Sequence, residues 1–314
     1  MKKILLLIGK GIGIFFASLI CLFGLVLGGV NAAKFLIYSE YYSIESNLCI
    51  NPGLNDGFIC QGISVIDSED KIVVSGYMMD KSASRIYVTD TDNNSYYVSL
   101  YNGSKAFTGH CGGVSCSQEN VYIATGEKVY TISIDTILSA KNGDIIDIGT
   151  GIQVNNKASF SYCDDTYLYV GDFMDVDNYN TKHPYQTNDG LYYAIVSKYD
   201  LNDLTTPVKI YSIRNKVQGI CFTPDGKVIL STSYGLADSH YYVYNEADAI
   251  DSNTTLDGAP VYYLNNCLRD IKGPAMAEGL DYYNGKIVTL TESACNKYIF
   301  GKLFFANKVV GFEV

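Results

Sequence analysis

The sequence contains no tryptophan, six prolines and three histidines. His110, His183 and His240 leave few bases for a catalytic Ser-His-Asp triad. Three motifs are also missing: His-Glu-x-x-His, Cys-x-x-Cys and Gly-x-Ser-x-Gly. Their absence removes support for zinc hydrolase chemistry and for hydrolases with a nucleophile elbow.

Long blocks rich in Ala, Leu, Glu and Lys, which would predict helices, are missing as well. The chain instead holds 28 tyrosines, and Tyr, Val, Ile and Thr favour half-buried strands. Hydrophobic residues make up 47% of the 314 residues, which is ample for a core. The composition therefore predicts an all-β protein.

Positive charge is scarce outside the N-terminus. The first thirty residues hold Lys2, Lys3 and Lys10 and no acid, so the remaining chain carries 20 basic against 33 acidic groups. A surface of that sign repels phosphate backbones, and no basic stripe interrupts it. We therefore expect no nucleic-acid partner.

The N-terminus predicts a membrane segment. Residues 11–30 contain no charge and would form about 30 Å of helix, enough to cross a bilayer core. Residues 1–10 form a basic segment that we place in the cytoplasm, so the remaining chain would lie outside it. A retained signal anchor is the preferred interpretation. The alternative is a secreted protein cleaved at Val30-Asn31-Ala32, which resembles a signal-peptidase site.

Five similar segments follow residue 58. Each has a small residue, an alternating apolar run, a polar turn and a second run of strand-forming residues. The segments begin ICQGISVIDSEDKIVVSGY, HCGGVSCSQENVYIATG, KASFSYCDDTYLYVGDF, VQGICFTPDGKVILSTSYG and AEGLDYYNGKIVTLTES. Their small residues, Gly62, Gly113, Ser159, Gly219 and Gly279, are 51, 46, 60 and 60 positions apart. This period predicts a repeat architecture.

Further runs predict a third and a fourth strand for most units, and four strands per unit indicate a β-propeller. We expect the third strands in SRIYVTD, KVYTISI, YAIVSKY and HYYVYN, and the fourth in YYVSLY, DIIDIG, PVKIYSI and APVYYL. The last unit lacks a fourth strand, and residues 31–58 are expected to form a linker with a ring-closing strand. Residues 59–314 would then form five blades, or six if residues 34–58 hid more structure. The small residues would sit where first strands crowd around the axis, or would mark simple bulges.

Four segments resemble a family of uncharacterised bacterial extracytoplasmic proteins with motifs of the types P-Q-G, G-H-x-G-G-V, Q-G-x-x-F-T-P-D-G and E-S-x-x-x-K-Y. Here they read FTGHCGGVS, KASFSYCDDTYLYVGDF, VQGICFTPDGKVILSTSYG and GPAMAEGLDYYNGKIVTLTESACNKYIFGK. The resemblance covers about residues 59–314 and implies a propeller outside the cytoplasm, but no activity. This chain has Cys60 where relatives have the proline of P-Q-G.

The starts of first strands and the ends of second strands lie on one face of a propeller, so their residues should surround the channel mouth. A ring of amide, imidazole, ammonium and carboxylate groups is typical of a small-ligand site. The predicted ligand-binding residues are Gln61, His110, Lys157, Asp172, Gln218, Tyr234, Glu278 and Glu292. The loop over residues 174–190 also lies on this face and carries Asp175, Asp177, His183 and Asp189.

Three of these residues are candidates for catalysis. Glu278 and Glu292 would act as an acid and a base if their environments separate their pKa values, and His110 would serve near neutral pH. Channel mouths are often simply polar and wet, which is the competing interpretation. No cofactor is expected; weak Ca²⁺ ligands are Asp172, Asp175 and Asp177, but the loop fails the EF-hand pattern.

Eight of the nine cysteines follow the membrane segment. We expect mainly free thiols, and Cys60 with Cys111 is the pair to test as a disulfide because they occupy equivalent positions in neighbouring units.

Three functions remain open. The first is a membrane-anchored module that binds a small polar ligand or a protein segment at the channel mouth. The second is a surface enzyme, a hydrolase or lyase acting on a glycan or another polar substrate. The third is a non-catalytic scaffold. The fold does not choose among them, because propellers host all three.

Overall fold

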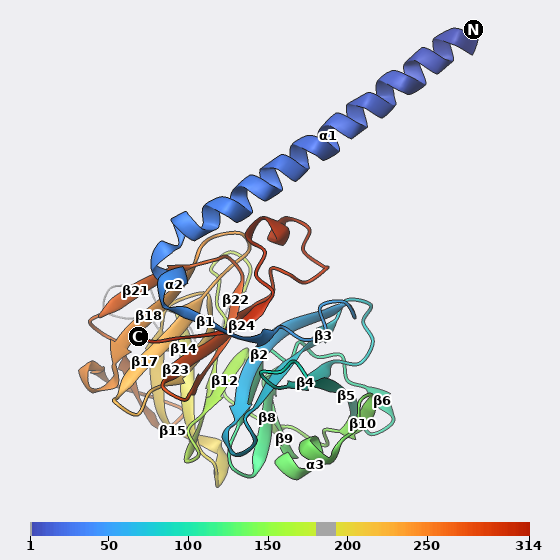
Figure 1. Cartoon of the computed structure of the whole chain (residues 1–314). Coiled ribbons are helices and arrows are strands. Elements are labelled where there is room, and N and C mark those ends of the chain that lie inside the picture. Colours follow the sequence, from blue (N-terminus) through green and yellow to red (C-terminus); the bar gives the residue numbers. More distant parts are fainter. Residues whose placement is uncertain (1, 180–192) are drawn as a thin grey trace.

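The computed structural model describes residues 2–179 and 193–314. The strands form five sheets arranged around a common centre, and one long helix extends away from them (Figure 1). The protein is therefore a five-bladed β-propeller with an N-terminal apolar helix, as the repeat predicts.

Each blade has a four-stranded antiparallel core. Blade one is β2 (Phe58–Ile66), β3 (Lys71–Met78), β4 (Arg85–Thr89) and β5 (Ser95–Asn102). Blade two is β7 (Gly113–Cys116), β8 (Asn120–Thr125), β9 (Lys128–Ser133) and β11 (Ile152–Gln153). Blade three is β12 (Phe160–Cys163), β13 (Tyr167–Gly171), β14 (Ala194–Asp200) and β15 (Asp203–Ile213). Blade four is β16 (Val217–Phe222), β17 (Lys227–Thr232), β18 (Ser239–Asn245) and β21 (Arg269–Gly273).

Blade five takes its outermost strand from the N-terminal region. It consists of β22 (Ala277–Tyr283), β23 (Lys286–Thr291), β24 (Lys308–Phe312) and β1 (Glu45–Ile50). β1 pairs antiparallel with β24, with Glu45 opposite Phe312. The two ends of the propeller chain thus meet in one sheet, which leaves no gap in the ring.

The N-terminal helix is longer than the sequence indicates. α1 spans Lys2–Ile37 without a break, and α2 (Ser39–Ile44) follows at once. The segment 31–44, expected as linker, is therefore helical. Gly9–Ile37 is long and apolar enough to cross a membrane, as a signal anchor or a signal peptide would.

Two fourth-strand predictions are wrong. The run DIIDIG forms β10 (Asp144–Asp147), which pairs parallel with β5 of blade one rather than with β9. The run APVYYL forms β20 (Ala259–Tyr263), which pairs parallel with β15 of blade three and antiparallel with β19 (Ile250–Leu256). Each run follows a short helical turn, α3 (Ile134–Ser139) or η2 (Glu246–Asp248), that carries the chain to the neighbouring blade. Strand propensity identifies a strand but not its partner.

Three short elements complete the chain. They are η1 (Asp67–Glu69) in a turn of blade one, β6 (Lys105–Ala106) beside β5, and η3 (Phe300–Phe304) between β23 and β24. η3 is the element of the propeller that lies against α1.

The repeated glycines are needed at the centre of the ring. A Cβ atom on Gly62 would lie 2.5 Å from the backbone nitrogen of Val114, and one on Gly219 would lie 2.6 Å from that of Leu280. Both contacts are with the first strand of the next blade and are too short for any side chain. The interpretation of close approach around the axis is confirmed.

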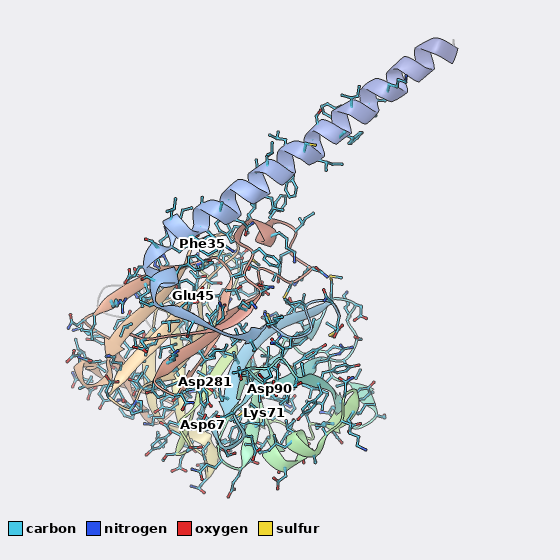
Figure 2. All side chains as sticks on the ribbon, in the orientation of Figure 1. Phe35, Glu45, Asp67, Lys71, Asp90 and Asp281 are labelled. Carbon is cyan, nitrogen blue, oxygen red and sulfur yellow. The ribbon has the colours of Figure 1, made fainter. Side chains whose placement is uncertain are left out.

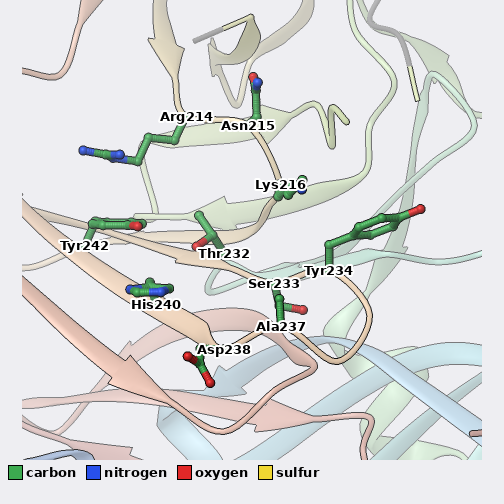
Figure 3. Close-up of a pocket in the computed structure, with 10 residues that line it drawn as sticks. All are labelled: Arg214, Asn215, Lys216, Thr232, Ser233, Tyr234, Ala237, Asp238, His240 and Tyr242. Carbon is green, nitrogen blue, oxygen red and sulfur yellow. The ribbon is translucent and has the colours of Figure 1, made fainter. Parts of the chain in front are cut away.

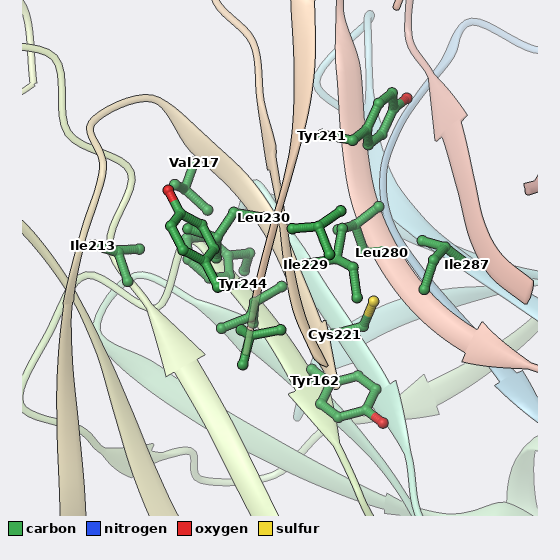
Figure 4. Packing of buried hydrophobic residues seen from close by; sticks show 14 of the residues in the cluster. Tyr162, Ile213, Val217, Cys221, Ile229, Leu230, Tyr241, Tyr244, Leu280 and Ile287 are labelled. Carbon is green, nitrogen blue, oxygen red and sulfur yellow. The ribbon is translucent and has the colours of Figure 1, made fainter. Parts of the chain in front are cut away.

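The core lies between neighbouring blades. Ile229 of β17 and Leu280 of β22 belong to the largest buried cluster, which joins the blades three, four and five (Figure 4). Burial of each such side chain contributes roughly 1.5–3 kcal/mol to stability. The blades are thus held together by apolar packing, which fixes the geometry of the channel that they surround.

Candidate functional site

A cavity of about 1000 Å³ opens where the first strands begin and the second strands end. Seven of the eight predicted ligand-binding residues line it: Gln61, His110, Lys157, Gln218, Tyr234, Glu278 and Glu292. The structure thus brings together residues spread over more than 230 positions of the sequence. We call this cavity the channel mouth.

β-Bulges position three of these side chains. The pairing of β2 with β3 shifts between Cys60 and Ile63, and Gln61 lies in that bulge. Corresponding shifts occur at Gln218 in β16 and at Glu278 in β22. An extra residue in one strand re-aims a side chain locally, so the same irregularity in three blades directs a polar group at the channel mouth.

Glu278 and Glu292 form a carboxyl pair at one wall. Glu278 is 3% exposed, and no described residue hydrogen-bonds its carboxyl group. Burial and the nearby Glu292 raise its pKa well above the usual range. The amide of Gln61 donates to Glu292 Oε2 over 2.9 Å. Burial raises the pKa of Glu292 to about 7, against the opposing influence of Lys297 and Gln61.

His110 stands in an aromatic and cationic group. Its ring lies 4.5 Å from the ring of Tyr77, centre to centre. Lys297 donates to the Tyr77 hydroxyl and lies over the rings of Tyr77 and Tyr298. The surrounding channel walls and the charge of Lys297 lower the pKa of His110 to about 4. His110 is therefore neutral at pH 7 and offers a hydrogen-bonding imidazole without a charge.

Lys157 reaches the mouth, but Asp172 does not. The Lys157 ammonium pairs with Glu127 over 2.9 Å. Asp172 is fully buried behind the cavity wall, and its Oδ1 accepts the backbone N–H of Lys157 over 2.6 Å. Asp172 thus holds the start of the third blade in place. The sequence pattern identifies the end of a strand but not the direction in which its last side chain points.

The weak Ca²⁺ ligands serve other contacts. Asp175 accepts from Asn178 and pairs with Lys216 over 3.3 Å. Among residues 2–179 and 193–314, no group of three His, Cys, Asp or Glu side chains is arranged to hold a metal ion. His183 and Asp189 lie outside the described residues.

The cysteines are free thiols. The sulfur of Cys60 lies 3.8 Å from that of Cys295, so its neighbour is in blade five and is not Cys111. Burial raises the pKa of the Cys60 thiol. Cys60 therefore packs as a small apolar residue directly behind Gln61.

The loops between second and third strands bring further aromatic residues to the predicted Tyr234. Phe173, Tyr179 and Tyr234 form an aromatic group, with the rings of Phe173 and Tyr234 5.9 Å apart. Tyr298, Ile299 and Phe300 of blade five line the same cavity. The argument from loop position that drew attention to Asp175 and Asp177 would have found these residues had it been applied to apolar side chains and to blade five.

A smaller cavity of about 290 Å³ adjoins the mouth at blade four (Figure 3). Its charged groups are paired within the protein. Asp238 lies 2.5 Å from Lys272 and accepts the Tyr38 hydroxyl, and His240 lies 2.7 Å from Asp270. This cavity therefore presents ion pairs, whereas the channel mouth presents the Glu278 carboxyl, to which no described residue donates a hydrogen bond.

No family model matches the chain, and no curated protein does. Solved structures do resemble it. Glutaminyl cyclase from Myxococcus xanthus is 8% identical, with 86% of this chain and 94% of that chain covered and a TM-score of 0.46. The PQQ-bound aldose sugar dehydrogenase from Streptomyces coelicolor is 11% identical, with 79% and 77% covered and a TM-score of 0.41. The Dos1 propeller is 7% identical, with 78% and 68% covered and a TM-score of 0.34. Likenesses at this level say nothing about ligand or activity in this chain.

Proposed function

We propose that this chain binds a small polar ligand in the channel mouth. The observation that supports the proposal is the Glu278 carboxyl, which is buried, faces a large cavity and has no hydrogen-bond partner among the described residues. Glu278 lines the cavity and is within reach of a bound molecule. A ligand group that hydrogen-bonds to it would contribute about 0.5–1.5 kcal/mol to binding.

The groups around Glu278 favour a ligand with several hydroxyl groups, such as a sugar. Protonated Glu278 both donates and accepts hydrogen bonds, and the amides of Gln61 and Gln218 do the same. Tyr234 and Phe173 offer aromatic faces for an apolar side of the ligand. Mono- and oligosaccharides combine these two surfaces, which makes them the first probes to use.

The test is a thermal-shift screen of the full-length chain in detergent with sugars, cell-wall fragments and Ca²⁺. A ligand at 100 times its dissociation constant should add about 2.7 kcal/mol to the free energy of unfolding. Glu278→Leu should abolish the shift and Glu278→Gln should keep part of it. Glu119→Gln, an exposed carboxyl in a distant turn, serves as control and should behave as wild type. A shift of equal size in Glu278→Leu, or no shift with any probe, would contradict the proposal.

A second candidate is catalysis at the same place. It is favoured by the raised pKa values of the two neighbouring carboxyls: burial and the nearby Glu292 raise the pKa of Glu278 well above the usual range, and burial raises that of Glu292 to about 7. One could donate a proton as the other accepts one, as general acid–base catalysis requires. Turnover of a ligand found in the screen, lost in both Glu278→Gln and Glu292→Gln, would establish an enzyme; binding without turnover would leave a binding module.

A further inference from the structure

We propose that the mouth-bearing end of the propeller lies on the bilayer that α1 crosses, with a ring of apolar side chains in its headgroup layer. The occupant of this surface is the membrane itself. The inference requires that α1 is retained as an anchor, and it does not depend on the ligand proposed above.

Large apolar side chains are exposed around the channel mouth. They come from the loops between second and third strands in four of the five blades. Ile299 and Phe300 are 64% and 60% exposed, and Val176 is 60% exposed. We define the apolar rim as Met79, Val176, Tyr179, Tyr234, Leu236, Ile299 and Phe300. An exposed ring of this kind marks an interaction surface.

The apolar rim is joined directly to α1. The Asn31 amide of α1 donates to the carbonyl of Lys302 over 2.8 Å, and the ring of Tyr38 lies 6.3 Å from that of Phe304. Both partners belong to η3, whose first residue is Phe300 of the rim. Figure 1 shows α1 leaving the propeller beside η3, at the end remote from α3. α3 follows a third strand and therefore marks the end opposite the mouth.

The spacing along α1 leaves no room for water between the propeller and the membrane. The uncharged stretch that begins at Gly11 ends at Ala33, and Asn31, near its end, already contacts η3. Headgroup layers are about 5–8 Å thick on each side of the hydrocarbon core, and a helix rises about 1.5 Å per residue. η3 thus lies within the headgroup layer if the uncharged stretch fills the core.

Several side chains at the junction of α1 and η3 are of the types found at the interface between a membrane and water. Phe35 and Phe305 face a shared hollow with Leu27, and Leu36 of α1 is 82% exposed although it lies beyond the uncharged stretch. Aromatic rings and lysine ammonium groups are enriched at headgroup depth. Lys34 and Lys302 lie at this junction, where their ammonium groups donate to the carbonyls of Phe305 and Ala294, so the aromatic rings carry the argument here.

Docking has one consequence for the channel mouth. A mouth that opens onto the bilayer receives molecules that move along the membrane surface, such as the polar end of an amphiphile. This consequence rests on the proposed ligand site, whereas the docking itself rests on the apolar rim and α1.

The absence of tryptophan gives a direct test. Phe300→Trp places a single tryptophan in the rim, and Ser68→Trp places one in an exposed turn at the other end. Each full-length variant is reconstituted into phosphatidylcholine–phosphatidylglycerol vesicles, with and without phosphatidylcholine brominated near the headgroup. We expect bromine to quench most of the Phe300→Trp emission and to leave Ser68→Trp unchanged, whereas aqueous iodide should do the reverse.

Equal quenching of the two variants by bromine, or none in either, would overturn the proposal. So would recovery of the protein free of vesicles, because α1 would then not anchor it. Ile299→Trp is a second rim variant and should match Phe300→Trp if the latter folds poorly. Ligand binding is not read out, so failure here is separate from failure of the proposed function.

Discussion

The two ends of the propeller use carboxylate residues in opposite ways. The turns between first and second strands, at the end remote from the mouth, contain seven acidic residues and no basic or large apolar one: Asp67, Glu69, Asp70, Glu119, Asp164, Asp165 and Asp225. Figure 2 shows Asp67 at this end, and Phe35 where α1 meets the propeller. At the mouth, Asp172, Asp175 and Glu278 are buried, and the exposed acids Asp80 and Asp177 stand beside exposed apolar side chains.

The carboxyl groups of Asp164, at the far end, and Glu278, at the mouth, differ in their hydrogen bonds. Asp164 Oδ1 accepts the backbone N–H groups of Thr166 and Tyr167, and Oδ2 accepts the Tyr169 hydroxyl. Glu278 accepts no such bond from a described residue. The far end therefore uses carboxylates to build turns, while the mouth keeps the Glu278 carboxyl at the wall of a cavity.

The largest expected effect is a pH dependence that originates at the mouth. A folded-state pKa raised from 4.5 to about 7 means that Glu292 binds its proton more tightly in the folded protein. Its contribution is present in full below pH 4.5 and is lost as pH rises through 7, which lowers the free energy of unfolding by up to about 3 kcal/mol. Glu292→Gln should reduce the fall measured in denaturant titrations between pH 4.5 and 7.5, and the part that comes from the raised pKa of Glu278 should remain.

The far end provides the matched control for that prediction. Hydrogen bonding to Thr223 holds the pKa of Asp225 below its usual value, despite a small opposing effect of burial. Its contribution is therefore present above pH 4 and is lost below it, so Asp225→Asn should leave the slope between pH 4.5 and 7.5 unchanged. If Glu292→Gln left the slope of unfolding free energy against pH unchanged, the proposed contrast between the mouth and the far end would be wrong.

A second pair of substitutions should change stability in opposite directions. Asp164→Ala removes three hydrogen bonds and leaves the buried Tyr169 hydroxyl without a partner, which should cost about 2 kcal/mol. Glu278→Leu removes the cost of desolvating a carboxyl and its repulsion with Glu292, and should raise the free energy of unfolding by about 1 kcal/mol at pH 7. Urea denaturation at pH 7 measures both. Destabilisation by Glu278→Leu would show that the carboxyl has a partner.

The smallest expected effect concerns His110. Because its pKa is about 4, the ring should not titrate between pH 5.5 and 8. Histidine-selective NMR labelling, with His110→Gln to assign the signal, should show a constant chemical shift over this range. A midpoint near 6.5 would mean that the channel walls do not desolvate the ring.

The five-bladed ring and most residues of the channel mouth could be predicted from the sequence, because both depend on the repeat. A glycine at the same point of successive units is required by backbone contact around the axis, and equivalent positions in a repeat converge in space. Gln61, Gln218 and Glu278 could therefore be placed together without coordinates.

Other features depend on partners that no local pattern specifies. β10 and β20 look like fourth strands, but helical turns carry them to the neighbouring blade. Asp172 and Glu292 each follow the second strand of a blade. The side chain of Glu292 lines the cavity, whereas that of Asp172 accepts a hydrogen bond from the backbone N–H of Lys157. The neighbour of Cys60 is in a loop of blade five, which has no equivalent in the other units.

The most direct test of the account is an infrared titration of the full-length chain, taken as the difference between wild type and Glu278→Gln. The account predicts a protonated carboxyl band that persists at pH 7 in wild type and is missing from the variant, because burial and the nearby Glu292 raise the pKa of Glu278 well above the usual range. A band that disappears by pH 5, as expected for the carboxylates of the far end, would contradict it.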